Sequence, residues 1–253
     1  MLAVRSALIW IVTTFMMTVL SLVAIIVSFW DGSGRSYLRL ARVWARIWLG
    51  ISNTEVKVFG TENIEKAKAY VVASNHSSYF DIPALLAYLP LEFRMVAKQS
   101  ISYVPVLGWG MKRGDFIFIK RGANREALRS LDGSIKRLKE GKSVVLFADG
   151  TRSMYGNIQP FKRGAFMVAE RAGADILPVT ILGSHKIMQR NSSLISSGTI
   201  TVVIGKPISN LGKSADELLK ETYLAVSENF ERYKNACFTA EDIALMNQNS
   251  CKE

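Results

Sequence analysis

Residues 70–83 read YVVASNHSSYFDIP, a short strand-like run that passes through a polar loop into a helix. The first four residues are aromatic, β-branched or small, a composition typical of a buried strand. Asp81 begins the helical stretch, with Pro83 in its first turn, where proline is tolerated. A strand, a loop and a helix in this order form the repeating unit of an α/β fold, in which polar loops at the carboxyl ends of strands carry the chemistry.

The same alternation continues on both sides of this stretch. Strands are expected at Val56 to Phe59, Tyr70 to Ala73, Phe93 to Ala97, Phe116 to Ile119, Val144 to Phe147, Ile176 to Ile181 and Ile200 to Ile204. Helices are expected at Asp81 to Leu89, Arg125 to Glu140, Gly164 to Ala172 and Ala215 to Tyr233. The pattern predicts one α/β domain over residues 53–253, with a largely parallel sheet flanked by helices.

The charge balance restricts the partners of this chain. It has 253 residues and a net charge of +11, which favours an acidic partner such as anionic lipid, a phosphorylated small molecule or nucleic acid. Its two cysteines, Cys237 and Cys251, lie near the C-terminus. We therefore expect free thiols in a reducing compartment rather than a disulfide framework or a cysteine metal site.

A long apolar segment lies near the N-terminus. Between Arg5 and Asp31 there are 25 residues without a charge. As a helix they would extend about 37 Å, enough to cross the roughly 30 Å hydrocarbon core of a bilayer. A signal peptide would have a shorter apolar region and a cleavage site of small residues. Because this segment is longer and ends in the bulky Phe29 and Trp30, we interpret it as a retained membrane anchor.

A second helix, basic and amphipathic, is expected over residues 35–49. Its two faces are Arg35, Arg39, Arg42 and Arg46 on one side and Leu40, Val43, Trp44, Ile47 and Trp48 on the other. Such a helix suits a membrane interface, although it would also suit nucleic acid or the surface of its own domain. We expect residues 1–52 to anchor the protein in the inner membrane, either spanning it or lying in one leaflet. Since these arginines outnumber Arg5, the rest of the chain should face the cytoplasm.

His76 and Asp81 form a candidate proton-transfer pair. On one continuous helix, residues five apart would point away from each other, but a histidine in the loop can meet a carboxylate in the first helical turn. The carboxylate would then hold one imidazole nitrogen while the other accepts a proton from a hydroxyl. A purely structural alternative is that Ser78 and Asp81 form a helix cap.

A second polar loop follows the expected strand at Val144 to Phe147. It reads Ala148-Asp149-Gly150-Thr151-Arg152-Ser153. A glycine, a hydroxyl and an arginine directly after a strand can present backbone N–H groups and a guanidinium to a phosphate. The alternative is an ordinary Asp-Gly turn.

Taken together, these segments resemble the glycerolipid acyltransferase family, which includes 1-acylglycerol-3-phosphate acyltransferases. Four blocks occur in family order: a His-x-x-x-x-Asp block at His76 to Asp81, a Gly-x-x-Phe-Ile-x-Arg-like block at Gly114 to Arg121, a Phe-Pro-Glu-Gly-Thr-Arg-Ser-like block at Phe147 to Ser153, and a Val-Pro-Val-like strand at Leu177 to Val179. Each block alone is a weak to moderate signal, but all four in order are specific. Ala148 and Asp149 depart from the family's Pro and Glu in the third block.

The resemblance implies roles for particular residues. His76 would be the general base and Asp81 its orienting partner. Residues around the phosphate of the acceptor would be Arg121, Gly150, Thr151, Arg152 and, from a family lysine, Lys98. The other histidine, His185, is expected to be structural or peripheral. The segment Phe161 to Gly164 adds basic charge, either at this site or as a solvated turn.

The resemblance also implies an activity. An acyl group would move from acyl-CoA or acyl-carrier protein to a lysophosphatidic acid-type acceptor within membrane phospholipids, forming phosphatidic acid without metal or cofactor. The chain has no Gly-x-Ser-x-Gly motif, which disfavours a serine acyl-enzyme. The alternatives are another lysolipid acceptor or a non-catalytic lipid-binding protein of the same fold. A nucleic-acid partner is disfavoured because the tryptophans cluster in the expected membrane segments.

Overall fold

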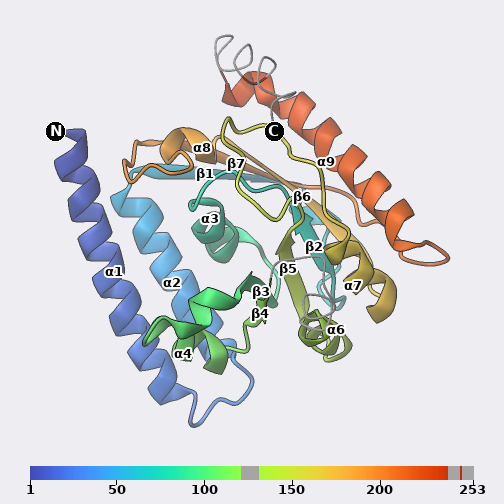
Figure 1. Cartoon of the computed structure of the whole chain (residues 1–253), viewed down its shortest axis with the longest axis horizontal. Coiled ribbons are helices and arrows are strands. Elements are labelled where there is room, and N and C mark those ends of the chain that lie inside the picture. Colours follow the sequence, from blue (N-terminus) through green and yellow to red (C-terminus); the bar gives the residue numbers. More distant parts are fainter. Residues whose placement is uncertain (121–130, 239–245, 247–253) are drawn as a thin grey trace.

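The computed structural model describes residues 1–120, 131–238 and 246. Its centre is a seven-stranded sheet with the order β1-β7-β6-β2-β5-β3-β4 (Figure 1). The strands are β1 (Thr54–Phe59), β2 (Val71–Ser74), β3 (Phe93–Lys98), β4 (Ile117–Ile119), β5 (Ser143–Phe147), β6 (Ile176–Leu182) and β7 (Gly198–Ile204). All seven lie where the sequence predicted strands.

The sheet is largely parallel, as predicted. Strand β2 pairs in parallel with β5 on one side and β6 on the other, and every other pairing is also parallel except that of β6 with β7. Strand β2 is buried along its whole length, because it has a neighbour on each edge and helices over both faces. Loops that leave β2, β5 and β6 therefore emerge at the same edge of the sheet.

Helices cover both faces of the sheet (Figure 1). One face packs against α2 (Arg35–Ile51) and α3 (Asp81–Tyr88), with α1 (Leu2–Val27) packed on the outer side of α2, and the other face packs against α6 (Asp132–Lys139), α7 (Gly164–Ala172) and α9 (Ala215–Cys237). Residues 125–130 of one expected helix lie outside the described residues. The sequence analysis did not anticipate α4 (Leu107–Arg113), α8 (Ser184–Ile187) or the short 3₁₀ turns η1 (Thr61–Asn63) and η2 (Gln99–Tyr103).

The two N-terminal helices form an antiparallel hairpin along one side of the molecule (Figure 1). Helix α1 buries mainly small or hydroxyl residues, and its large apolar side chains point outward. Of the helices described, α1 is the one long and apolar enough to cross a membrane. A helix that exposes its apolar side chains and buries its small ones suits a lipid environment.

Helix α2 is more deeply integrated than its amphipathic pattern predicted. Trp48 is buried, and its ring lies 5.0 Å from that of Phe80 in the loop that follows β2. On the basic face, Arg42 donates hydrogen bonds to the carbonyls of Leu89 and Leu91 at 3.1 and 2.5 Å. Arg42 therefore binds the α/β domain, where its guanidinium satisfies carbonyls of the chain directly after α3, so for this arginine the alternative of a helix packed on its own domain holds.

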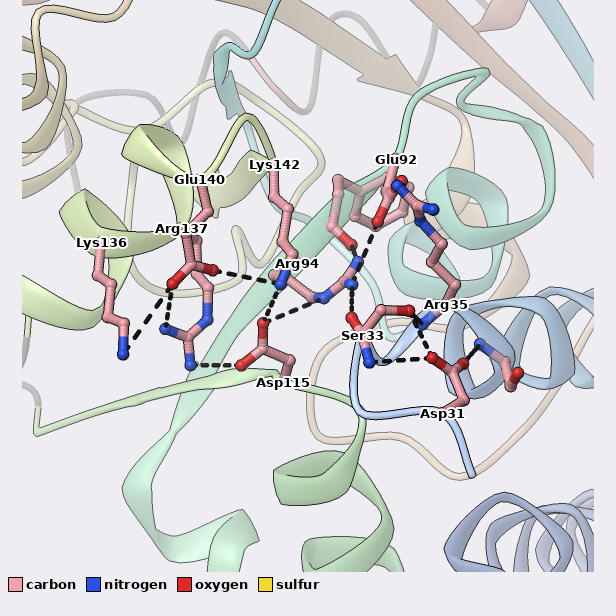
Figure 2. Close-up of polar contacts among 12 residues, drawn as sticks. Asp31, Ser33, Arg35, Glu92, Arg94, Asp115, Lys136, Arg137, Glu140 and Lys142 are labelled. Atoms are coloured by element: carbon pink, nitrogen blue, oxygen red, sulfur yellow. Dashed lines mark hydrogen bonds and ion pairs between the residues drawn. The ribbon is translucent and has the colours of Figure 1, made fainter. Parts of the chain in front are cut away.

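A buried arginine fixes the turn between α1 and α2 to the sheet (Figure 2). Arg94 on β3 donates to the carbonyl of Ser33 at 2.6 Å and forms an ion pair with Asp115 at 3.7 Å. Asp115 also pairs with Arg137 on α6 and with Lys142. Removing one partner from such a buried network leaves an uncompensated charge, which is strongly destabilising. The hairpin is thus held to the α/β domain by polar as well as apolar contacts.

Candidate active site

Three loops meet at the carboxyl edge of the central strands. Ser74, the last residue of β2, lies level with Phe147 at the end of β5 and with Val179 in β6. The polar loop that begins at Asn75 therefore lies between the loop that follows Phe147 and the turn that follows β6. Sequence segments that are about 70 and 100 residues apart become neighbours in this way.

His76 and Asp81 are brought together, as their spacing predicted. The Nδ1 atom of His76 lies 2.7 Å from Oδ2 of Asp81, and both side chains are buried. An ionised carboxylate can only accept, so this contact places the proton of a neutral imidazole on Nδ1. The other nitrogen, Nε2, is then a lone-pair acceptor directed away from the carboxylate.

Asp81 also organises the loop that carries His76. Its Oδ2 atom accepts the backbone N–H groups of Ser77 and Ser78 at 2.7 and 2.9 Å. The helix cap proposed as a structural alternative is only partly formed, because the hydroxyl of Ser78 donates to the carbonyl of Met188 at 2.7 Å. One carboxylate therefore serves both the loop and the imidazole.

Asn75 attaches the same loop to β6. Its Nδ2 group donates to the carbonyl of Ile181, and the N–H of Ile181 donates back to its Oδ1, both at 2.8 Å. Next to it, the hydroxyl of Ser77 lies 2.8 Å from that of Ser184 at the start of α8. These buried contacts fix the residues on either side of His76 to β6 and α8.

Asp149 lies beneath the histidine. Its Oδ2 atom accepts the backbone N–H of His76 at 2.7 Å, while Oδ1 is buried without a hydrogen-bond partner among the described residues. Burial raises the pKa of Asp149 well above its usual value; the charge of Asp81 adds to this, and the bond from His76 opposes it. Phe147 stacks on the imidazole ring, with centroids 3.9 Å apart. The shorter carboxylate noted in the sequence thus supports the backbone of His76.

The third-block loop supplies a cation next to this pair. Gly150 has a φ of +71°, a conformation that favours glycine. Thr151 is exposed, and Arg152 is half-buried with its guanidinium 3.8 Å from the ring centre of Tyr79. One terminal nitrogen of Arg152 is buried and has no hydrogen-bond partner among the described residues. The donors of this nitrogen are thus unused within the part of the chain that the structure describes, and the half-buried guanidinium carries the positive charge that an anionic ligand requires.

Other basic residues differ in how close they lie to the loop that carries Gly150 and Arg152. Lys162 lies against Gly150, since a Cβ there would be 3.2 Å from its Nζ, whereas Arg163 pairs with Asp216. Lys98 is exposed at the end of β3, and among the described residues it forms no hydrogen bond or ion pair with the loop residues above. Arg121 lies outside the described residues.

Several contacts had no sequence signal. Arg190 donates to the backbone carbonyl of Arg152 at 3.0 Å, and the ring of Tyr79 lies against the guanidinium of Arg152. Both contacts join segments that are distant from each other in the chain. His185, in α8, is buried beside Phe238 and Gly156, which fits the structural position expected for it.

The arrangement can accept a proton and bind an anion side by side. Nε2 of His76 can accept a proton, the buried Asp81 lies where a carboxylate would stabilise an imidazolium, and Arg152 carries positive charge at the same edge of the sheet. A substrate that presents both a hydroxyl and a phosphate would suit this pair of groups.

Comparisons with known proteins show the family to which this chain is related. Residues 55–182 match the family model described as Acyltransferase. The chain is 34% identical over 192 residues to a chloroplast 1-acyl-sn-glycerol-3-phosphate acyltransferase of Arabidopsis thaliana, covering 74% of this chain and 53% of the plant protein. It is 33% identical over 176 residues to the 1-acyl-sn-glycerol-3-phosphate acyltransferase of Saccharomyces cerevisiae, covering 68% and 57%. The chain thus spans little more than half the length of these two relatives.

One solved structure is similar over nearly all of the chain. It is the 1-acyl-sn-glycerophosphate acyltransferase of Thermotoga maritima, with a TM-score of 0.80 and 26% identity, covering 92% of this chain and 98% of that one. The similarity therefore includes the N-terminal hairpin as well as the α/β domain.

Proposed function

The chain belongs to the Acyltransferase family, and on this basis we propose that it transfers a fatty acyl group to the free hydroxyl of 1-acylglycerol-3-phosphate, forming phosphatidic acid. The observation that carries the proposal is the buried pair of His76 and Asp81, 2.7 Å apart, in a loop next to that of Arg152. The names of the relatives favour the same acceptor, which supplies both a hydroxyl and a phosphate.

The proposed reaction proceeds by direct transfer. Nε2 of His76 takes the proton of the acceptor hydroxyl as its oxygen attacks the thioester carbonyl carbon. The tetrahedral intermediate then collapses, the carbon–sulfur bond breaks, and the imidazolium returns its proton to the departing thiolate. Asp81 stabilises the imidazolium between these two transfers.

The phosphate of the acceptor is proposed to bind at Arg152, whose unpartnered nitrogen can donate to it, with Gly150 and Thr151 contributing the loop backbone. Lys98 and Arg121 are proposed as further ligands, and Lys162 joins them because it lies against Gly150. The acyl donor is proposed to be acyl-CoA or acyl-carrier protein. The membrane would be the inner membrane, with the α/β domain on its cytoplasmic side.

The role of Asp81 can be separated from folding by Asp81→Asn. An amide oxygen at the position of Oδ2 still accepts the loop N–H groups and the N–H on Nδ1, but it lacks the negative charge that stabilises the imidazolium. Turnover should therefore fall by several orders of magnitude, as in other His–Asp pairs, while the circular dichroism spectrum and melting temperature change little. Near-normal turnover would exclude this pairing as part of the mechanism.

The activity itself is tested with labelled acyl-CoA and acyl-carrier protein against a panel of lysophospholipid acceptors in vesicles. We expect transfer to be highest with 1-acylglycerol-3-phosphate and to be lost in His76→Ala. Transfer to a different acceptor would redirect the proposal. Binding of lysolipid without thioester consumption would favour the non-catalytic alternative.

A further inference from the structure

Helix α4 is packed onto the N-terminal hairpin through glycines. A Cβ at Gly110 would lie 3.3 Å from the side chain of Ser21 on α1 and 3.0 Å from the ring of Tyr37 on α2. At Gly114 it would lie 2.3 Å from the same ring. The backbone of α4 and its C-cap Gly114 therefore lies so close to the hairpin that a Cβ would be crowded at Gly110 and would clash at Gly114. Whatever depth α1 adopts in a bilayer, α4 is held at its side (Figure 1).

The segment leading into α4 is also held in place. Val106 has a φ of 62°, a strained conformation for a β-branched residue that persists only where the surrounding packing fixes it. Gly108 lies against the backbone of Ser102, where a Cβ would be 2.5 Å from the carbonyl oxygen. The side chains that this segment exposes are thus displayed by a firm scaffold.

Those exposed side chains are large and apolar. Tyr103 is 71% exposed and Trp109 56% exposed, and Val104 between them is also exposed. At the end of α1, Phe29 and Trp30 are exposed as well. Aromatic side chains of this kind are enriched at the headgroup level of membranes, where an apolar ring and a polar edge are both satisfied.

The charged residues around this surface are basic, which favours contact with anionic lipid. Residues 93–114 contain no acidic residue, and Lys112 and Arg113 follow Trp109 on the exposed side. The guanidinium of Arg113 lies 5.0 Å from the ring centre of Phe29. This contact makes the α4 surface continuous with the apolar end of α1. Basic residues beside exposed aromatics attract the negatively charged leaflet of a membrane.

We propose that the segment Gln99–Arg113, comprising η2 and α4, is a second lipid-contacting element, with Tyr103 and Trp109 at the headgroup level of the leaflet that faces the α/β domain. The proposal rests on the membrane attachment in the proposed function. It has a consequence for substrate access: Lys98, directly before this segment, would lie at the headgroup level, where the phosphate of a membrane-resident acceptor is found.

The test uses the full-length chain with Cys237→Ser and Cys251→Ser. Single cysteines replace Trp109, Ile11 on α1, or Leu224 on α9, and each carries an environment-sensitive fluorophore. The matched positions are 56%, 66% and 50% exposed. Phosphatidylglycerol vesicles containing doxyl quenchers at known depths should quench the label at position 109 near the headgroup and the label at 11 more deeply, and leave that at 224 unchanged.

The outcomes separate the two proposals. A label at 109 that stays in water while that at 11 is quenched would overturn the role of α4 and leave the membrane attachment intact. A label at 11 that also stays in water would overturn membrane attachment itself. Quenching at 224 equal to that at 109 would show non-specific adsorption and likewise overturn the role of α4.

A second measurement is independent of labelling. Tyr103→Ser with Trp109→Ser should lower activity on a long-chain acceptor in vesicles by about tenfold, the effect expected if about 60 Å² of apolar surface no longer leaves water. Activity of this double variant on a short-chain soluble acceptor should stay unchanged. In the control Leu224→Ser, activity on the long-chain and on the short-chain acceptor should both stay unchanged. An equal loss on both acceptors would contradict the proposal.

Discussion

The loops that leave β2 and β5 lie side by side, yet they are held in different ways. In the loop that carries His76, the polar side chains of Asn75, Ser77, Ser78 and Asp81 all bond to protein groups. In the loop that carries Arg152, the guanidinium rests on an aromatic ring, and one of its nitrogens has no partner among the described residues.

The difference teaches how two tasks are separated at one edge of the sheet. Proton transfer requires a fixed imidazole, so the bonds around His76 are formed before substrate arrives. Anion binding requires donors that are not yet used, so the neighbouring loop keeps positive charge available. Four substitutions can break or sharpen this contrast.

The largest effect is expected from His76→Ala. It removes the proton acceptor, and general-base catalysis usually contributes about 10²–10⁴-fold to the rate. Turnover should fall by that factor for all acceptors, while acceptor affinity, measured by equilibrium binding, changes little. A folded variant with near-normal turnover would show that another group takes the proton.

Arg152→Ala is expected to act on the other loop. A charge-assisted hydrogen bond to an anion is worth about 1.5–3 kcal/mol, so affinity for the phosphate-bearing acceptor should fall by about 10–100-fold. Affinity for the acyl donor should be nearly unchanged. Equal losses for donor and acceptor would indicate a disrupted structure, because binding of the acceptor phosphate by Arg152 predicts a selective loss for the acceptor.

Tyr79→Leu should have a smaller effect of the same kind. Removing the aromatic ring under the guanidinium loses a cation–π contact worth about 0.5–1 kcal/mol at an exposed site. The apparent KM for the acceptor should rise by about two- to fivefold, with kcat little changed. Tyr79→Phe keeps the ring and should behave like the original protein; if it showed the same defect as the leucine variant, the stacking explanation would be wrong.

The smallest effect concerns Asp149→Asn and appears as a dependence on pH. Because the pKa of Asp149 is raised in the folded protein, the folded state binds its proton more tightly than the unfolded state. The free energy of unfolding therefore declines as pH rises from the ordinary carboxyl value of 3.8 towards the raised value, and then becomes level. Asparagine keeps an oxygen for the N–H of His76 but cannot titrate.

Melting temperatures of both proteins are followed by circular dichroism in detergent. As pH rises above about 4, the melting temperature of the original protein should fall relative to that of the variant. Other carboxylates cancel because both proteins contain them. A difference that is constant with pH would show that Asp149 is ionised in the folded state.

How much of this could be predicted from the sequence differs between elements. The strands were predictable because each is a short run of β-branched or apolar residues between turn residues. Helix α4 was not, since Gly108 and Gly110 lower its intrinsic propensity. It is stabilised by contacts with Tyr37 and Ser21, which are distant in the chain, and with Ser102 in the preceding 3₁₀ turn. Propensity describes the local chain, whereas α4 is formed by tertiary packing.

The site shows the same division. The pairing of His76 with Asp81 was predictable because both residues lie within one loop and the next helical turn. The bond from His76 to Asp149 joins residues 73 positions apart, and the contact of Arg152 with Tyr79 likewise links separate loops. The spacing of residues along the chain contains no information on either contact, because both depend on the pairing of β2 with β5.

The contact of Asn75 with Ile181 implies an order of opening for this edge of the molecule. Its amide takes the place of one more residue of β2, so the pairing with β6 continues into the loop. Loops around ligand sites usually admit deuterium early, because they open without the rest of the protein. Here the amide hydrogens of Ile181 and His76 should exchange only when the central strands separate. The floor of the site and the middle of the sheet would then open as one cooperative unit.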